Sequence, residues 1–502
     1  MRIAIVGAGF AGLSAAKVLT AFGHDVVVFD KTPDVGGVWS RTRRYPGLTT
    51  QNNKGTYALS DFPMPRHYPE WPTGEQVQAH LQSYAEHFGL TDMLRLDTEV
   101  VSATPRAGGG WTIVTSAGTD TVDHLVVANG IFSDPAVPDY PGAAEFRAAG
   151  GRLCHASEFT ELEDARDKEV VVVGYGKSSC DVAVALAAVA SSTTVVAREL
   201  LWKMPRRIAG VVNYKYLLLT RLGEGLFRYI TPVGFERFLH GPGRAVRNGM
   251  LGSIQAQVVR QLKLDRLGLR PPGSLERIAR STVSLATEGF YEGVLDGTIS
   301  VRRDSRITRL LARDGRPAAE LGDGSVVAAD VVVCGTGFHQ RAPFLDEQVQ
   351  SRICDERGNF ALYRQILPHD MPDLTFCGYN SSFFSPLSAE VAALWIATHL
   401  AGGLDLPPVA QRRTHVVERL RWMEERTEGK HARGTNIIPF SVHNIDEMLA
   451  DLKVGVGRFR RFMEWLAPVD PGAYTHLTRE LLARHAAHTA TEPAPMAQLR
   501  AS

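Results

Sequence analysis

The sequence predicts an α/β protein made of two doubly wound units, the second inserted into the first. Two stretches predict these units, because each joins a short apolar strand to a helix through a glycine-rich turn: residues 3–12 read IAIVGAGFAG, and residues 168–180 read KEVVVVGYGKSSC. Apolar strands that end in glycine turns follow at 124–130 and 330–335, and we expect each to close one unit. Both units are therefore predicted to be Rossmann-like dinucleotide-binding folds.

The first turn has glycine at the three positions that this fold requires. Gly7 makes the turn, Gly9 lets the backbone approach a pyrophosphate, and Gly12 lets the helix pack closely on the strand. The start of that helix presents free N–H groups to the anion. Asp30 ends the next strand, at 25–30, about 18 residues past Gly12, where a carboxylate can bind a ribose hydroxyl. A glycine-rich turn without a ligand is the alternative, which the spacing of strand, helix and acid disfavours.

The second turn repeats the pattern with one change. Gly174 and Gly176 follow the strand at 168–174, and a helix is expected over 180–190. Ser179 takes the place of the third glycine, and serine is small enough for close packing of helix on strand. We therefore expect a second dinucleotide site here.

The residue that ends the next strand of the second unit predicts which dinucleotide binds. The strand at 193–197 is followed by Arg198, where an acid would bind a ribose 2′-hydroxyl. Arginine fits a 2′-phosphate, and so this position favours NADPH over NADH. An ordinary surface arginine beside Glu199 is the alternative.

Composition excludes several classes of function. The 502 residues include 55 Lys and Arg against 54 Asp and Glu, which gives no indication of nucleic-acid binding. The five cysteines form no C-x-x-C pair, which argues against a disulfide framework, a metal site and a dithiol redox centre. The most apolar stretch, 384–404, is interrupted by Glu390 and His399, and the first strand leaves no room for a signal peptide. We therefore expect a cytoplasmic protein.

The pattern along the chain predicts four segments. Residues 1–165 form the first part of the first unit, 166–325 the inserted unit, and 326–485 the rest of the first unit with C-terminal helices; 486–502 is expected to be a flexible tail. Within the inserted unit, an insertion at about 200–290 is rich in aromatic residues.

Nine Lys and Arg residues against two Glu occur in the first part of this insertion, between residues 200 and 250. Such a basic amphipathic segment can cover a substrate pocket or touch a membrane surface. A packed insertion with a solvated basic face is the alternative, and the sequence does not favour membrane contact.

Two dinucleotide folds in one chain imply electron transfer between two cofactors, of which one is a flavin. Residues 1 to about 400 resemble the flavin-containing monooxygenases and, more distantly, the Baeyer–Villiger monooxygenases. The resemblance rests on the order and spacing of several motifs: Gly7-x-Gly9-x-x-Gly12, Gly36-Gly37-x-Trp39, Arg44–Gly47, Ser60–Pro63, Gly174-x-Gly176-x-Ser178-x-x-Asp181 and Gly335–Phe338.

This resemblance implies two cofactor sites. FAD would lie along Gly7–Gly12, with Asp30 on its ribose and with Gly37 and Trp39 near the remaining phosphate and the ring. NADPH would lie along the second turn, in contact with Gly174, Gly176, Ser178 and Ser179, with Arg198 at its 2′-phosphate.

It also implies a reaction. NADPH reduces FAD, oxygen adds to give a flavin C4a-hydroperoxide, and one oxygen atom passes to a nitrogen or sulfur of a small organic substrate. The alternatives are a Baeyer–Villiger oxygenase that converts a ketone to an ester or lactone, and a non-catalytic flavin-binding regulatory protein. The expected partners are the substrate and molecular oxygen, with a homodimer as one assembly to test.

The chain departs from the family at the candidate catalytic residues. The family's hydrogen-bonding asparagine falls on Gln51, with Asn52 and Asn53 beside it, where the Baeyer–Villiger relatives have aspartate. Phe159 stands where those relatives have tryptophan, which favours oxidation of a heteroatom. Arg280 lies in a segment loosely like the one that holds their active-site arginine. Gln51, Asn52 and Arg280 are therefore the catalytic candidates.

Overall fold

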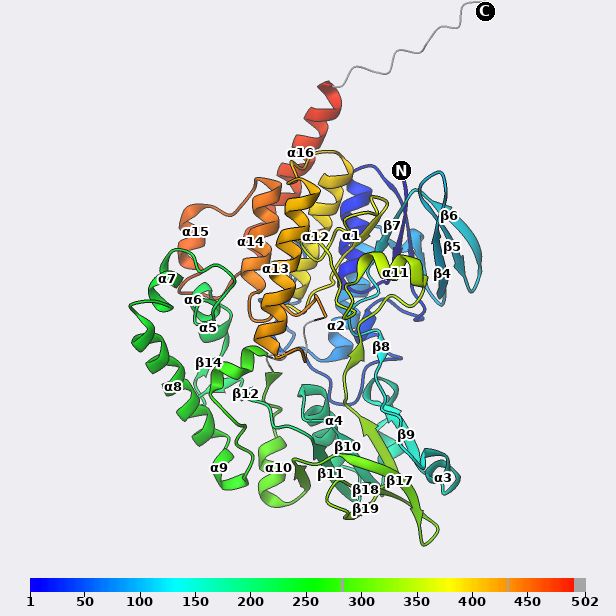
Figure 1. Cartoon of the computed structure of the whole chain (residues 1–502), viewed down its shortest axis with the longest axis vertical. Helices are drawn as coiled ribbons and strands as arrows, with labels where there is room; N and C mark the ends of the chain where they lie inside the picture. Colours follow the sequence, from blue (N-terminus) through cyan, green and yellow to red (C-terminus); the bar gives the residue numbers. More distant parts are fainter. Residues whose placement is uncertain (281–283, 431–432, 492–502) are drawn as a thin grey trace, which may run out of the picture.

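The protein contains two five-stranded sheets, each made of parallel strands, and helices cover both of them (Figure 1). The computed structural model describes residues 1–280, 284–430 and 433–491. The first sheet has the order β22–β7–β1–β2–β3. Its strands are β1 (Arg2–Val6), β2 (Asp25–Phe29), β3 (Leu94–Arg95), β7 (His124–Val127) and β22 (Leu374–Phe376).

The second sheet has the order β16–β11–β10–β20–β9, again parallel throughout. Its strands are β9 (Arg152–His155), β10 (Glu169–Val173), β11 (Ser192–Ala197), β16 (Ile299–Arg303) and β20 (Val331–Cys334). The predicted fold class is thus confirmed. The sheet reaches beyond the segment 166–325 at both ends, because β20 pairs with β10 on one side and with β9 on the other.

The chain passes between the two sheets through a two-stranded ribbon. β8 (Asp134–Pro135) pairs antiparallel with β21 (Phe338–His339). The backbone N–H of Ala136 also donates a hydrogen bond to the carbonyl of Gly337, at 3.1 Å. The outgoing and returning chains therefore run side by side.

Smaller elements complete each unit. A three-stranded antiparallel sheet consists of β4 (Val100–Pro105), β5 (Trp111–Thr115) and β6 (Gly118–Val122). A second one consists of β17 (Ile307–Arg313), β18 (Arg316–Leu321) and β19 (Val326–Ala328). The helices outside the 200–290 insertion are α1 (Phe10–Ala21), α2 (Gly74–His87), α3 (Ala143–Ala148), α4 (Lys177–Ala187), α10 (Phe290–Asp296), α11 (Glu347–Ile353), α12 (Ser385–Leu400), α13 (Val409–Thr427), α14 (Ser441–Leu452), α15 (Arg458–Met463) and α16 (His476–Thr491).

Two helix boundaries differ from the expected ones. α4 begins at Lys177 rather than at residue 180, because Gly176 is extended and caps the helix. α16 continues to Thr491, past the expected start of the tail at residue 486, and residues 492–502 lie outside the described part of the chain.

The apolar stretch that begins near residue 384 forms α12, which packs against α1 in the core. Its Glu390 is 2% exposed and accepts hydrogen bonds from the Ser60 N–H (2.8 Å) and from Lys17 Nζ (3.4 Å). Lys17 also pairs with Asp61 at 2.8 Å. Burial raises the pKa of Glu390, and Lys17 opposes that rise. Over the described residues 1–280, 284–430 and 433–491, the helices are too short or too polar to cross a bilayer.

The 200–290 insertion consists of short elements and one 18-residue helix, α8, and it lies beside the C-terminal helices (Figure 1). They are β12 (Lys203–Met204), β13 (Arg207–Ile208), β14 (Val212–Asn213), α5 (Lys215–Leu218), α6 (Arg221–Gly225), α7 (Phe235–Leu239), α8 (Arg244–Gln261), α9 (Leu264–Leu267), η5 (Leu275–Arg280) and β15 (Ser284–Leu285). Three of the nine basic residues noted in the sequence, Lys203, Arg221 and Arg247, are buried rather than solvated.

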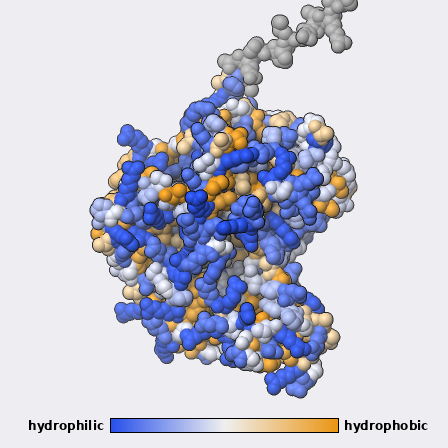
Figure 2. All heavy atoms as spheres, in the orientation of Figure 1, coloured by the Kyte–Doolittle hydropathy of each residue, from blue (hydrophilic) through white to orange (hydrophobic). Residues whose placement is uncertain are grey.

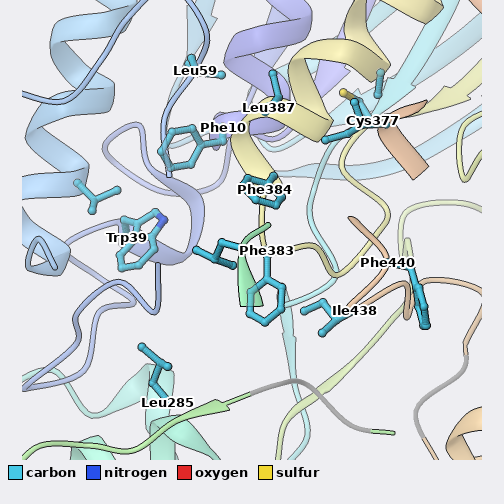
Figure 3. Packing of buried hydrophobic residues seen from close by; sticks show 14 of the residues in the cluster. Phe10, Trp39, Leu59, Leu285, Cys377, Phe383, Phe384, Leu387, Ile438 and Phe440 are labelled. Atoms are coloured by element: carbon cyan, nitrogen blue, oxygen red, sulfur yellow. The ribbon is translucent and has the colours of Figure 1, made fainter. Parts of the chain in front are cut away.

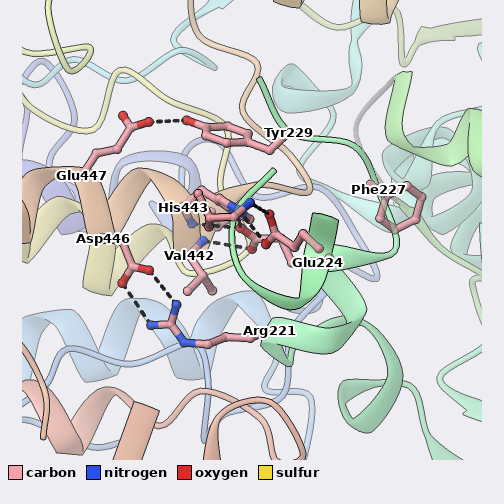
Figure 4. A network of polar contacts seen from close by, with 12 residues as sticks. Arg221, Glu224, Phe227, Tyr229, Val442, His443, Asp446 and Glu447 are labelled. Atoms are coloured by element: carbon pink, nitrogen blue, oxygen red, sulfur yellow. Dashed lines mark hydrogen bonds and ion pairs between the residues drawn. The ribbon is translucent and has the colours of Figure 1, made fainter. Parts of the chain in front are cut away.

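A polar network holds the insertion on α14 (Figure 4). Arg221 pairs with Asp446 at 2.6 Å and with the buried Glu464 at 2.8 Å. Tyr229 donates a hydrogen bond to Glu447 at 2.5 Å. Because each partner is itself charged or hydrogen-bonded, these links compensate for the loss of water around buried charges.

His443 lies at the centre of this network, between two buried carboxylates (Figure 4). Its Nδ1 contacts Glu224, and its Nε2 lies 2.9 Å from Glu236. Burial alone would lower the pKa of His443, but the hydrogen bonds and charges of the two glutamates raise it to about 10. The imidazole is therefore charged at neutral pH and ties α6 and α7 to α14.

We predict that His443→Gln destabilises the protein by about 3–5 kcal/mol near pH 6, because it leaves two carboxylates without their buried partner. The pKa in the folded protein lies above that of an unfolded histidine, about 6.5, so this contribution is complete below pH 6.5 and is lost as the pH rises toward 10. Thermal unfolding between pH 6 and pH 10 measures the effect. The exposed His67→Gln is the control. A deficit for His443→Gln that does not change with pH would contradict the assignment.

Candidate cofactor and catalytic site

The first turn brings backbone against backbone at Gly7 and Gly12. Gly7 has a φ of +114°, and a Cβ there would lie 2.3 Å from the carbonyl oxygen of Ala128 at the end of β7. A Cβ on Gly12 would lie 1.7 Å from the carbonyl oxygen of Gly7. Glycine is therefore required at both positions, as predicted, and α1 starts directly at the carboxyl end of β1.

Gly9 and Gly37 face each other beside this turn. A Cβ on Gly9 would lie 3.6 Å from the Cα of Gly37, and one on Gly37 would lie 3.3 Å from the Cα of Gly9. Two backbones without side chains thus form a cradle at the N-terminus of α1, which fits a pyrophosphate. Gly37 begins the short helix η1 (Gly37–Trp39), and the Trp39 ring packs edge-on against Tyr57, with 5.9 Å between the centroids.

Trp39 belongs to a large buried apolar cluster that continues to the start of α12 (Figure 3). Phe10, Phe383 and Phe384 are members of the same cluster and are less than a tenth exposed. The cluster keeps water away from the region between the first turn and the C-terminal helices.

Asp30 holds the first turn closed. Its carboxylate accepts a hydrogen bond from the Ala8 N–H at 2.6 Å and from the backbone N–H and hydroxyl of Thr32 at 2.8 and 2.7 Å. The side chain is half-buried at the end of β2, where the ribose contact was predicted. The same carboxylate therefore supports the turn itself.

At the second turn, the close approach of helix to strand depends on a different pair of residues, Ser179 and Gly335. Gly174 has a φ of +114°, and a Cβ on it would lie 2.7 Å from the carbonyl oxygen of Gly335 and 2.7 Å from Ser179 Oγ. Ser179 is fully buried and donates a hydrogen bond to the Gly335 carbonyl at 3.2 Å. A Cβ on Gly335 would lie 2.2 Å from Ser179 Oγ. The serine thus fits because glycine faces it, while Gly176 at the N-cap of α4 has open space around it.

Contacts between Tyr45 and α4 join the two turns. The Tyr45 hydroxyl donates to Ser178 Oγ at 3.0 Å, and a Cβ on Gly47 would lie 3.3 Å from the carbonyl oxygen of Asp181. Asp181 forms a buried ion pair with Lys177 and accepts a hydrogen bond from Thr287 at 2.6 Å. Burial, with the nearby Asp181 charge, raises the pKa of Tyr45, so the hydroxyl stays neutral and can donate.

Arg198 is exposed at the end of β11, within a group of cations around Glu199. Lys430 pairs with Glu199 at 2.9 Å. The hydrogen bond from Lys430, followed by the charges of Lys430, Arg277 and Arg198, lowers the pKa of Glu199. Three cations therefore lie around one carboxylate. Lys430 and Arg277 were not predicted, because they come from other parts of the chain.

The three neighbouring amides at 51–53 have different surroundings. Asn52 donates to the carbonyl of Phe383 and accepts from the Tyr214 hydroxyl at 3.2 Å. Asn53 accepts from the backbone N–H of Thr56 at 3.0 Å. Gln51 differs, since its Oε1 is buried and lacks a hydrogen-bond partner among the residues that the structure describes. Of the two predicted catalytic amides, only Gln51 has its side-chain oxygen available, because Asn52 serves to hold the loop.

The 200–290 insertion positions this loop. Tyr214, which is fully buried, donates to the backbone carbonyl of Gln51 at 2.8 Å. Arg206 donates to the Thr49 hydroxyl at 2.8 Å and stacks over the Trp71 ring. The two segments are about 160 residues apart, so no local sequence signal marks this clamp.

Arg280 lies elsewhere in the fold. It ends η5, where its guanidinium pairs with Glu428 at the end of α13, and its side chain is 39% exposed. Arg277 lies 3.7 Å from the same carboxylate. The segment that holds Arg280 is therefore next to the cations around Glu199. The guanidinium is held by Glu428, and the catalytic role of Arg280 stays a prediction.

Two strand–glycine turn–helix units, linked by the contacts of Tyr45 with α4, define a protein with two dinucleotide-binding folds. The family model described as "Flavin-binding monooxygenase-like" matches residues 1–456. The chain belongs to this family, and so it is an enzyme, an FAD-dependent monooxygenase with NADPH as its second cofactor. The resemblance predicted from the sequence motifs is confirmed.

Individual relatives agree with this membership. The chain is 25% identical over 433 residues to "Dimethylaniline monooxygenase [N-oxide-forming] 4" of Mus musculus, which covers 81% of this chain and 71% of that protein. Its fold is similar to that of S-allyl-L-cysteine S-oxygenase from Allium sativum, with a TM-score of 0.61, 18% identity and coverage of 98% and 99%. It is also similar to cyclohexanone monooxygenase, with a TM-score of 0.67, 17% identity and coverage of 89% and 96%.

The contact between Gly335 and Ser179 predicts that substitutions at these two positions compensate each other. Gly335→Ala should destabilise the protein by about 1–3 kcal/mol, because the new methyl group overlaps the Ser179 side chain. Ser179→Gly should be tolerated, and the double variant should regain most of the lost stability. Denaturant unfolding of the four proteins gives the coupling free energy. If the two substitutions simply add, Ser179 does not fill the space that Gly335 leaves.

Proposed function

We propose that the protein transfers one oxygen atom from molecular oxygen to a nucleophilic nitrogen or sulfur of a small organic substrate. The observation that carries this proposal is the neutral amide of Gln51, whose buried oxygen is unpartnered in the described structure. Arg280, the candidate arginine for ketone oxidation, is paired with Glu428. A neutral amide at this position, together with the pairing of Arg280 to Glu428, supports heteroatom oxidation over Baeyer–Villiger insertion.

The first turn would hold FAD. The cradle of Gly9 and Gly37 admits the pyrophosphate, and the N-terminus of α1 offers backbone N–H groups to it. Asp30 would bind a ribose hydroxyl, and Trp39, as part of the buried apolar cluster, would lie near the flavin ring. When bound, the flavin supplies the redox chemistry: it accepts a hydride from NADPH and activates molecular oxygen.

The second turn would hold NADPH. Gly176 and the N-terminus of α4 would receive the pyrophosphate, with Ser178 beside it. Arg198, assisted by Arg277 and Lys430, would bind the 2′-phosphate, because it sits at the end of β11 within a group of cations. The contact from Tyr45 to Ser178 fixes the second turn relative to the loop of the first unit.

The protein's own contribution to the chemistry is to orient and to exclude water. Tyr214 and Asn52 hold the backbone of the 51–53 segment, and the Gln51 Oε1 is buried without a partner among the described residues. From there it can hydrogen-bond to the nicotinamide or to the oxygen that is being transferred. The apolar cluster around Phe383 and Trp39 keeps bulk water from this region. The predicted cytoplasmic location and homodimer remain predictions.

A substrate panel tests the proposed function. The purified holoenzyme is supplied with NADPH, oxygen and, in turn, a tertiary amine, a thioether and a cyclic ketone, and the products are analysed by mass spectrometry. We expect an N-oxide or a sulfoxide. An ester or lactone from the ketone as the preferred product would establish the Baeyer–Villiger alternative instead.

The cation group around Glu199 predicts the choice of coenzyme. Arg198→Ala should raise the KM for NADPH by about tenfold to a hundredfold, because a charge-assisted hydrogen bond to a phosphate is lost, while the KM for NADH stays nearly constant. Steady-state NADPH and NADH oxidation measures both values. Arg316→Ala, an exposed arginine on β18, is the control. An equal change for both coenzymes would mean that Arg198 does not contact the 2′-phosphate.

The position of Gln51 predicts a loss of coupling. Gln51→Ala should lower the yield of oxygenated product per NADPH several-fold, with hydrogen peroxide as the balance, because the amide no longer orients the reacting groups. Tyr214→Phe should give a smaller loss of the same kind, since the loop loses one hydrogen bond. Gln82→Ala on α2 is the matched control. Unchanged coupling in Gln51→Ala would remove it from the site.

A further inference from the structure

Two short helices expose large apolar side chains next to one another, on the side of the molecule away from β4–β6 (Figure 1). They are α7, from the 200–290 insertion, and α15, near the C-terminal end. We call this the α7–α15 face; its apolar residues are Val233, Phe235, Phe238, Phe459, Phe462 and Leu466. Phe459 is 79% exposed, Leu466 65% and Phe462 60%. Elsewhere on the face of the molecule seen in Figure 2, hydrophilic residues predominate and hydrophobic ones occur in small groups.

Ring contacts join the two helices into one surface. Phe235 stacks on Phe238 with 5.5 Å between the ring centroids. Phe235 also packs edge-on against Trp465, directly after α15, at 5.9 Å. The Phe235 and Phe238 rings are therefore held in place, and Trp465 connects them to the segment that carries Phe459 and Phe462.

On the two helices and the residues next to them, basic side chains are exposed and acidic side chains are buried. Arg237, Arg244 and Arg458 are exposed at or near the face. The carboxylates of the same segments are turned inward: Glu236 is buried against His443, and Glu464 is buried against Arg221. The network that holds the insertion thus removes negative charge from the surface and leaves the arginines to define it.

Exposed aromatic rings flanked by arginines match the interface of an anionic lipid bilayer, where rings enter the headgroup region and cations meet lipid phosphates. A second copy of the chain fits less well, because a two-fold contact would bring the same arginines against one another. We propose that the α7–α15 face docks this enzyme on an anionic membrane surface. The inference does not depend on the substrate assigned above.

Vesicle flotation of the holoenzyme tests this proposal, with phosphatidylcholine vesicles that either contain or lack phosphatidylglycerol. The native protein should float with the anionic vesicles, much less with the neutral ones, and less at high salt. Phe459→Ser combined with Phe462→Ser should lower the bound fraction by about tenfold, and Arg244→Glu combined with Arg458→Glu by a similar factor. Val101→Ser combined with Val417→Ser removes as many exposed apolar residues from other surfaces and should leave binding unchanged.

Flavin absorbance and melting temperature show whether each variant is folded, so that a loss of flotation is not mistaken for unfolding. Failure of the native protein to float with anionic vesicles overturns the proposal, as does binding that survives the double phenylalanine substitution. A dimer in analytical ultracentrifugation that the same substitution dissociates, without lipid binding, would assign the face to a second copy.

Discussion

Close approach of backbone to backbone at the two strand–helix turns is the constraint on which the rest of this structure depends. At the first turn the distance from a Gly12 Cβ to the carbonyl oxygen of Gly7 would be only 1.7 Å, so α1 can begin there only without a side chain. At the second turn a serine occupies the helix position, and Gly335, directly after the neighbouring strand β20, leaves the space for it. The first turn achieves this close approach with glycine on the helix, and the second with serine on the helix and glycine facing it. In both turns the N-terminus of a helix is left free for an anion.

Buried charge has a different role, since it fixes how the peripheral segments sit on this core. The Lys17–Glu390 pair joins α1 to α12, and the His443 imidazolium joins the insertion to α14. Charged pairs of this kind add little net stability, because desolvation offsets their attraction, but an alternative packing would leave them unpaired. These pairs therefore fix how the insertion is oriented on the core. That orientation places Tyr214 of the insertion against the 51–53 loop.

Local patterns predicted the strands, turns and helices that bind the cofactors, because glycine spacing and apolar periodicity act over a few residues. They did not predict that β9 belongs to the second sheet, since its partner β20 is about 180 residues away. The same limit applies to the site. Gln51 and Asn52 look equivalent in sequence, and only the hydrogen bonds from Tyr214 and to Phe383 distinguish them. Arg280 was assigned by analogy of spacing, and the ion pair with Glu428 could not be read from either residue alone.

The ribbon of β8 and β21 has a consequence for how one unit is accommodated within the other. The segment from Ala136 to Gly337 leaves and re-enters the first unit at hydrogen-bonded positions, so its two ends are neighbours. A folded domain whose ends are adjacent can be spliced into a surface loop of another without pulling either one apart. The second nucleotide-binding unit can therefore sit inside the first without interrupting the fold of either one.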